Sequence, residues 1–514
     1  MYTVKYICLL IAGVLLFSCE VDYNSDPNQP EVAPTSGIMN RAQKNLMDVT
    51  RDEWFSGRQM LLWVQYWNQV NYTEEDRFQY RESVNKGAWD DLYKNAQDLW
   101  DIITLNTDEA TKNDMAQYGP NVNQIAAARI MLVYNYLQAV ELWGNVPYAS
   151  YEGTNESFQA NRLKSDDISL VPYADQEDIY PDMLNELDKA QASIDEDEIV
   201  IQGDNFFGGD PVQWKKFANS LRLRIANRIK DVYPAAQGHI DAAIAAGVME
   251  SNADNAGVTY ELNAENGSPM YKAFYVSNRT DFAPSMQFVE LLQGKRGNFP
   301  ADPRLDIFVA DNADGFKVGI PLTSANGIVS GFTDESYPGE AIIGSETGAP
   351  NYTEIYMEYA EVCFIMSELN NWDQEWYEKG VMASLERWGV PTADINRYLA
   401  LLPTATEENV MMQKYIALYM QPMEAWSEYR RTGYPNTLVK PNETYTYSWN
   451  YKDDSGITRT ASVNYTFTPI GGLTNVPARN KYLLNEASVN NENLQAAIAA
   501  MGGDTQSTKL WWAK

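Results

Sequence analysis

Aromatic rings alternate with amides, acids and one arginine over residues 66 to 80. Flat rings stack on the C–H faces of sugars or on peptide side chains, and amide or guanidinium groups form paired hydrogen bonds with hydroxyls or amides. This mixture predicts a binding site for a ligand rich in such groups. The candidate residues are Trp67, Asn68, Asn71, Tyr72, Arg77 and Tyr80. The alternative is a polar loop that only covers the preceding helix.

A second cluster with the same chemistry lies at residues 274 to 282, in the middle of a long segment without regular periodicity. Its candidate ligand-binding residues are Tyr275, Asn278 and Arg279. The chain has 14 Trp and 33 Tyr, so most of its rings must belong to the core, and only rings outside a helical apolar pattern are candidates for binding.

Catalytic chemistry is restricted by the presence of a single histidine, His239. Catalytic triads and two-histidine zinc sites need further imidazoles, and neither of the usual glycine-rich nucleotide loops is present. A pair of carboxylates remains conceivable, but among 70 acidic residues some pair will always lie close together. We therefore predict no catalytic residue, no metal and no cofactor, with a surface glycoside hydrolase that uses a carboxylate pair as the alternative function.

The formal net charge of −31 excludes nucleic acid as a partner, because an acidic surface repels phosphates. Anionic lipid headgroups are disfavoured for the same reason. Membrane association would therefore require an acyl anchor.

Residues 1 to 18 have the pattern of a lipoprotein signal peptide. Lys5 precedes an apolar run from Ile7 to Phe17 that is too short to span a bilayer, and the run ends just before Cys19. The sequence around Cys19 resembles a bacterial lipobox, which predicts acylation of Cys19 followed by an acidic lipid tether over residues 19 to 36. The alternative is a cleaved secretory signal with an incidental cysteine. Cys363 lies in an apolar helical stretch and is expected in the core.

Apolar residues recur at helical spacing through most of the remaining chain, which predicts a mainly α fold. No linker divides residues 37 to 514, so we expect a single domain there. The predicted helices are 54–70, 88–105, 125–143, 179–194, 214–229, 355–369, 376–388 and 410–429. Long irregular segments, typical of functional loops, are expected at 144–175, 251–285 and 297–353.

Four short runs carry a family resemblance. They are Leu142-Trp143-Gly144-Asn145-Val146-Pro147-Tyr148, the run from Trp214 to Arg224, the run from Glu424 to Pro435, and Thr508-Lys509-Leu510-Trp511-Trp512. Together they resemble the SusD/RagB nutrient-binding lipoproteins, across nearly the whole mature chain. Near the C-terminus the sequence departs from the family, with Pro477-Ala478-Arg479-Asn480 where relatives commonly carry an arginine pair.

The resemblance implies tetratricopeptide-like helix pairs that support a loop-rich second half with minor β-hairpins. It also implies a lipid-anchored protein on the cell-surface side of the outer membrane, and the acidic tether resembles the surface-export signal of such lipoproteins. The implied partner is a SusC-like TonB-dependent barrel transporter, to which the protein delivers an oligomeric nutrient. The cargo class stays open, with an oligosaccharide favoured over an oligopeptide.

Residues 444 to 468 are not explained by the resemblance. Tyr445, Tyr447, Trp449 and Tyr451 fall at alternate positions, and a turn signal at 453–456 precedes a second alternating run. This pattern predicts a β-hairpin with an aromatic ladder on one face. The ladder either packs on the protein's own helices or projects towards the transporter or the cargo.

Overall fold

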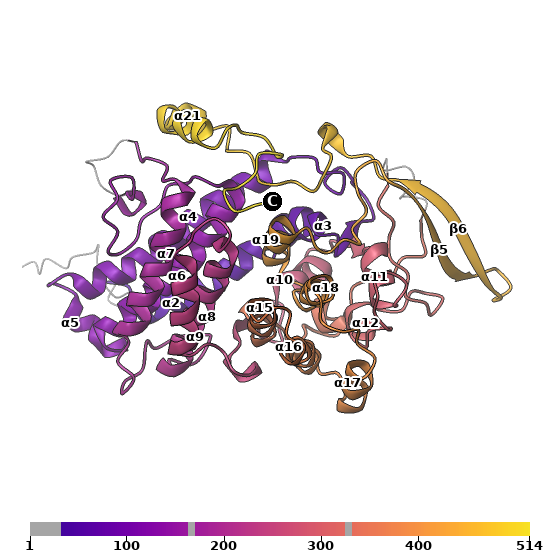
Figure 1. Ribbon diagram of the computed structural model, residues 1–514, viewed down its shortest axis with the longest axis horizontal. Helices are drawn as coiled ribbons and strands as arrows, with labels where there is room; N and C mark the ends of the chain where they lie inside the picture. Colours follow the sequence, from indigo (N-terminus) through magenta and orange to yellow (C-terminus); the bar gives the residue numbers. More distant parts are fainter. Residues whose placement is uncertain (1–31, 163–169, 324–331) are drawn as a thin grey trace, which may run out of the picture.

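The computed structural model describes residues 32–162, 170–323 and 332–514. The predicted signal peptide, Cys19 and most of the tether lie outside the described residues. The first half consists of long helices that pack in sequential pairs, side by side in Figure 1. These are α2 (Thr35–Thr50), α4 (Glu82–Thr107), α6 (Asn121–Trp143), α7 (Gln176–Ser193), α8 (Pro211–Ile229) and α9 (Ala236–Ala246). This arrangement confirms the predicted helix-pair fold.

Helix α8 illustrates how local sequence determines these elements. Asp210 accepts hydrogen bonds from the backbone N–H groups of Val212 and Gln213, and Pro211 occupies the first turn, where its missing N–H costs nothing. One apolar stripe of this helix is fully buried, and each large side chain in it contributes about 1.5–3 kcal/mol. The stripe consists of Trp214, Ala218, Leu221, Ile225 and Ile229.

The second half combines a helical group with irregular segments and three small antiparallel sheets. The helical group is α15 (Tyr359–Leu369), α16 (Gln374–Arg387), α17 (Thr392–Leu399), α18 (Glu407–Ala417) and α19 (Pro422–Thr432). Short helices include α5 (Lys112–Met115), α10 (Pro269–Tyr271), α11 (Met286–Leu292), α12 (Leu305–Phe308), α14 (Glu340–Ile343), α20 (Glu486–Val489) and α21 (Asn491–Ala500). The sheets pair β1 (Trp67–Gln69) with β3 (Phe282–Pro284), β2 (Ala256–Thr259) with β4 (Thr353–Met357), and β5 (Thr444–Lys452) with β6 (Thr458–Thr466).

Three predicted helices are wrong in part. The segment 54–70 forms a π-helix, η1 (Glu53–Met60), and the short α3 (Leu61–Trp63), and then turns into strand β1. The predicted start of 355–369 is strand β4. In both cases pairing with a distant strand overrides local helical spacing. The segment 410–429 is two helices, because Met420 has a positive φ of 68° and Pro422 has no N–H to continue the ladder.

The predicted hairpin is confirmed, with β5 and β6 in register from Thr444↔Thr466 to Lys452↔Thr458. Figure 1 shows it extending beyond the body of the protein, with its tip farthest away. Its aromatic face packs at the base on the irregular segments 319–323 and 332–334. Tyr445 donates to the carbonyl of Leu322 at 2.6 Å, and Tyr447 to that of Gly319 at 3.0 Å.

A buried group of charges joins the two halves, and we call it the ionic seam. It comprises Glu141, Arg224, Arg228, Glu361, Glu368, Lys414, Glu424, Glu428 and Arg431. Arg228 of α8 binds Glu141 of α6 at 3.1 Å and also pairs with Glu424 and Glu428 of α19. Arg431 binds Glu368 of α15 at 2.6 Å. The seam therefore ties the first helical half to the second.

The pKa values of two acids in the seam are shifted in opposite directions. Burial raises the pKa of Glu424 to about 7, against the effect of Arg228 and Arg224. Burial alone would also raise the pKa of Glu428, but Arg431, Lys414 and Arg228 together lower it well below its ordinary value. The seam is thus held by arginines that each contact more than one carboxylate.

Candidate functional site

The two predicted clusters, about 200 residues apart in sequence, lie side by side because β1 pairs with β3. Gln69 stands opposite Phe282, and the N–H of Val70 donates to the carbonyl of Asp281 at 2.6 Å. The structure therefore brings residues 67–72 and 274–282 together on one part of the molecule.

Trp67 and Asn68 are wrong as ligand-binding candidates, since both side chains are fully buried. The indole N–H of Trp67 donates to the Tyr419 hydroxyl at 2.8 Å, and Asn68 Nδ2 donates to the carbonyl of Ile320 at 3.1 Å. The ring of Trp67 packs on Phe274 and Phe282. The strand pairing draws β1 into the core, where these groups serve the fold.

Four other candidates are exposed at this place. Tyr72 is 59% exposed and Tyr275 is 38% exposed, and Asn71 and Asn278 are exposed with them. Tyr72 and Asn278 have positive φ angles of 60° and 53°, so each stands at a sharp change in chain direction. The ring of Tyr275 stacks on that of Tyr271 at a centroid distance of 5.8 Å, which restricts its orientation.

The remaining candidates are engaged with neighbours. Arg279 is partly buried and pairs with Asp281 at 2.6 Å, next to the exposed group. Tyr80 is partly buried and its hydroxyl donates to Glu82 at 3.1 Å, while Lys481 lies over its ring. The carbonyl of Arg77 accepts from the N–H of Ile470 at 2.6 Å. Arg77 and Tyr80 thus contact C-terminal segments.

Two exposed rings near the site were missed in the sequence. Trp54, at the start of η1, is 48% exposed, and Tyr337 is exposed and packs edge-on against Phe274. The guanidinium of Arg58 lies 4.8 Å from the Trp54 ring centroid and reaches Asp281 at 3.7 Å. Trp54 was assigned to an apolar helix, and no local signal separates it from core tryptophans. We call the exposed rings Trp54, Tyr72, Tyr275 and Tyr337 the aromatic surface.

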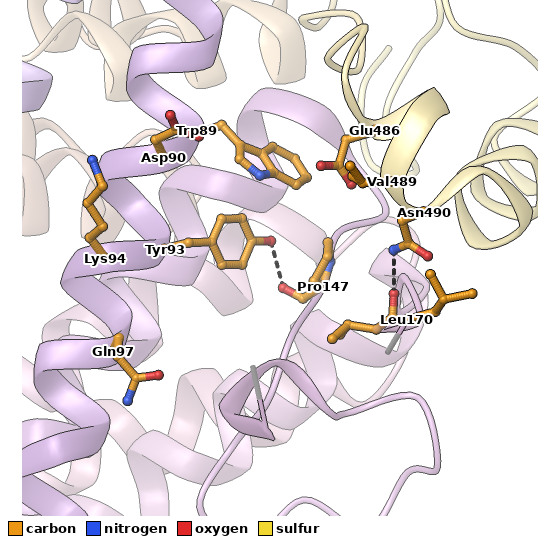
Figure 2. A pocket seen from close by; sticks show the side chains of 11 residues that line it. Trp89, Asp90, Tyr93, Lys94, Gln97, Pro147, Leu170, Glu486, Val489 and Asn490 are labelled. Atoms are coloured by element: carbon orange, nitrogen blue, oxygen red, sulfur yellow. Dashed lines mark hydrogen bonds between the residues drawn. The ribbon is translucent and has the colours of Figure 1, made fainter. Parts of the chain in front are cut away.

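A cavity of about 470 Å³ lies between α4, the C-terminal helix α20, and the loop residues Pro147, Leu170 and Val171 (Figure 2). The rings of Trp89 and Tyr93 face it, and Tyr93 donates to the carbonyl of Pro147 at 2.7 Å. Asn490 donates to the carbonyl of Val171 at 2.7 Å on the opposite side. The first bond fastens Pro147 to α4 and the second fastens Val171 to the C-terminal segment, so the hydroxyl of Tyr93 and the amide of Asn490 already serve the fold.

The described residues offer little for nucleophilic or metal chemistry. Cys363 is buried as predicted, and burial raises the pKa of its thiol to about 12. Burial and the nearby Arg222 lower the pKa of His239, whose Nδ1 accepts from Arg222 at 3.1 Å. Within 32–162, 170–323 and 332–514, no group of three or more His, Cys, Asp or Glu side chains is placed to hold a metal ion.

No helix in the described ranges has the length and apolar character needed to cross a membrane.

The sequence matches a family model described as "starch-binding associating with outer membrane" over residues 27–451. The chain belongs to the SusD-like family. A second model, for the SusD and RagB outer-membrane lipoproteins, matches residues 403–513. The protein is accordingly an outer-membrane lipoprotein of the cell surface, as predicted. Among curated proteins, none matches this sequence.

Solved structures show the same fold at low sequence identity. A SusD homologue from Parabacteroides distasonis matches with a TM-score of 0.73 and 20% identity over 93% of this chain and 98% of its own. A chitin-binding protein matches with a TM-score of 0.71 and 23% identity over 93% of this chain and 100% of its own. A chitin-binding SusD homologue from Flavobacterium johnsoniae has a TM-score of 0.68 and 22% identity, over 93% and 98% of the two chains.

The runs that carry the family resemblance are structural in this SusD-like protein. Trp143, Trp214 and Trp426 are fully buried, and Trp512 is nearly so. Arg224 and Glu424, from two of the runs, belong to the ionic seam. The recognisable residues therefore build the body that holds the aromatic surface.

Proposed function

We propose that this SusD-like protein binds an oligosaccharide at the aromatic surface and delivers it to a SusC-like TonB-dependent transporter in the outer membrane. The observation that carries the proposal is the group of exposed rings beside exposed amides, on elements that the buried β1–β3 pair fixes in place. Exposed aromatic side chains on a rigid base are typical of binding sites.

An oligosaccharide suits this surface better than an oligopeptide. The exposed polar groups next to the rings are the neutral amides of Asn71 and Asn278, which can pair with sugar hydroxyls. Arg58 and Arg279 are each engaged by Asp281 and leave little free charge for a peptide terminus. The family description names starch, and two similar structures are described as chitin-binding. A glycan array beside a peptide library tests the cargo class.

Anchoring is proposed to depend on acylated Cys19. The acidic body has no attraction for anionic lipids, so acyl chains must supply the affinity for the membrane. Cys19→Ala should move the protein from the detergent phase to the aqueous phase in detergent partitioning while the fold stays intact. Equal recovery of both forms in the detergent phase would contradict this.

A surface glycoside hydrolase is the second candidate function, and one observation favours it. Burial raises the pKa of Asp52 to about 7, which is the range that a general acid needs, and Asp91 lines the same cavity. The two functions differ in turnover. A binder returns an oligosaccharide at its original length, whereas a hydrolase shortens it.

Truncating two rings of the aromatic surface tests the binding proposal. Tyr72→Ala combined with Tyr275→Ala should weaken binding of the best glycan by about 1.5–3 kcal/mol in calorimetry, the scale for central aromatic anchors. Tyr151→Ala is the matched control, because Tyr151 is as exposed as Tyr275 but packs on Arg129 in another part of the molecule. Unchanged affinity in the double variant would refute the site.

A further inference from the structure

A cavity of about 310 Å³ opens beside Trp54, between the end of α2, the start of η1 and one face of α4. Its volume is on the order of ten water molecules, which is enough for one sugar ring. The lining residues are Val49, Asp52, Trp54, Phe55, Ser83, Val84, Gly87, Ala88 and Asp91. None of the residues predicted from sequence lines it.

Trp54 provides a platform at this cavity. Its ring is 48% exposed although it lies at the start of a helix whose next residue, Phe55, is buried. The guanidinium of Arg58 lies over the ring, and the rest of the ring is left to the cavity that it lines. A large ring that is held by a cation and still half exposed is suited to stacking on a flat apolar ligand face.

Gly87 also lines this cavity and has no side chain to fill it. It lies inside the 26-residue helix α4, where glycine costs about 1 kcal/mol relative to alanine. Packing does not demand this glycine, since a Cβ atom there would meet nothing within 4 Å. The absence of a side chain instead keeps the cavity open and exposes the helix surface to whatever occupies it.

Two carboxyl groups, those of Asp52 and Asp91, line the cavity. Asp52 accepts from the N–H of Phe55 at 2.7 Å through one oxygen, and Asp91 binds Lys94 at 3.0 Å. Burial raises the pKa of Asp52 to about 7, so near neutral pH its carboxyl group can donate as well as accept a hydrogen bond. Neighbouring hydroxyls on a sugar ring require both kinds of partner.

From this geometry we infer that the cavity is a subsite for one sugar ring at the end of the cargo, which stacks on Trp54 and lies over the Gly87 backbone. The inference rests on the proposed oligosaccharide-binding function and adds a position to it. Arg58 connects the subsite at Trp54 with the part of the aromatic surface around Tyr72 and Tyr275, because it contacts Trp54, Glu75 at 3.4 Å and Asp281 at 3.7 Å. Oligosaccharides long enough to reach from Tyr72 to Trp54 should therefore bind more tightly than shorter ones.

Filling the cavity tests the inference without unfolding the protein. In Gly87→Leu the new side chain enters open space and leucine is a better helix former than glycine, so stability should be kept or increased. Affinity for the longest oligosaccharides of the best-binding series should fall about tenfold, and affinity for the shortest binding member should stay unchanged. Trp54→Ala should reproduce this length dependence. Lys86→Leu, one residue away and outside the cavity, is the control and should bind all lengths normally.

The outcomes separate this inference from the proposed function. If Gly87→Leu binds every length like the wild type, while the Tyr72→Ala and Tyr275→Ala variant loses affinity, the subsite is wrong and the aromatic surface stands. If the wild type binds no oligosaccharide, both fail. If the wild type shortens the oligosaccharide and Asp52→Asn does not, the cavity is a catalytic site, which overturns the subsite.

Discussion

The ionic seam and the aromatic surface use their side chains in opposite ways. In the seam every charge is buried and meets at least one opposite charge, and the residues project from regular helices. At the aromatic surface the rings are half exposed, and Tyr72 lies on irregular backbone with a positive φ. The comparison indicates that the residues by which the family is recognised maintain the body, whereas the residues proposed to bind the cargo lie at its surface.

Breaking the seam should have the largest effect. Arg228→Met removes a cation that contacts Glu141, Glu424 and Glu428 together. Glu141 then loses its ion pair and keeps only the bond from Ser427, while Glu424 and Glu428 keep weaker compensation from Arg224 and from Lys414 with Arg431. We expect a loss of about 3–5 kcal/mol in the free energy of unfolding, measured by urea denaturation.

Lys86→Met is the matched control for Arg228→Met, because Lys86 forms an exposed ion pair with Asp90 one helical turn away. It should change stability by less than about 0.5 kcal/mol. If the two variants lost similar amounts of stability, burial would not be the reason that the charges of the seam stabilise the fold.

The next largest effect is expected at the border between core and surface, where the chain passes from buried Trp67 to exposed Tyr72. Trp67→Ala should cost about 3 kcal/mol of stability, because it leaves a cavity against Phe274 and Phe282 and removes the bond to Tyr419. Tyr72→Ala, five residues along, should leave the thermal midpoint unchanged and weaken cargo binding. Equal stability of both variants would contradict the assignment of Trp67 to the core.

This border also marks how far the sequence predicts the structure. Helices α4, α6 and α8 follow from apolar spacing, and the hairpin β5–β6 follows from strict alternation. Strand β1 does not, because its partner β3 lies more than 200 residues away and no local pattern encodes that pairing. The same contact buries Trp67 and exposes Tyr72, so ring chemistry alone could not separate a core residue from a surface one. Trp54 is exposed although its place in the apolar spacing is that of the first residue of a buried helix, so the sequence does not mark it as a surface ring.

A buried acid with too few partners should make stability depend on pH. Glu354 is 1% exposed, lies 3.7 Å from Arg51, and neither of its oxygens accepts a hydrogen bond. Burial raises its pKa to about 8, against the effect of Arg51 and Arg387. Between pH 4.5 and 8 the folded chain keeps a proton that the unfolded chain has lost, so the free energy of unfolding falls as pH rises in this window.

Glu354→Gln should remove this part of the pH dependence, because the amide mimics the protonated acid. The variant should match the wild type near pH 5 and exceed it near pH 8, with a difference that grows by at most about 1.4 kcal/mol per pH unit. Denaturant titrations of both proteins at several pH values give the difference between their free energies of unfolding. Groups that titrate in the same way in both proteins do not contribute to this difference. A constant difference across the window would show that Glu354 is ionised in the folded protein.

The smallest effects are expected in the hairpin. Tyr447 and Ser448 are neighbours in β5, and their side chains lie on its packed face and its exposed face, respectively. The hydroxyl of Tyr447 donates to the buried carbonyl of Gly319, whereas that of Ser448 bonds across the exposed face to Ser462 at 2.9 Å. Tyr447→Phe leaves that carbonyl without its partner and should cost about 1 kcal/mol in urea denaturation. Ser448→Ala should cost less than about 0.5 kcal/mol, because water can replace the lost partner. A reversed order would mean that the exposed polar ladder, and not the aromatic base, holds the hairpin in place.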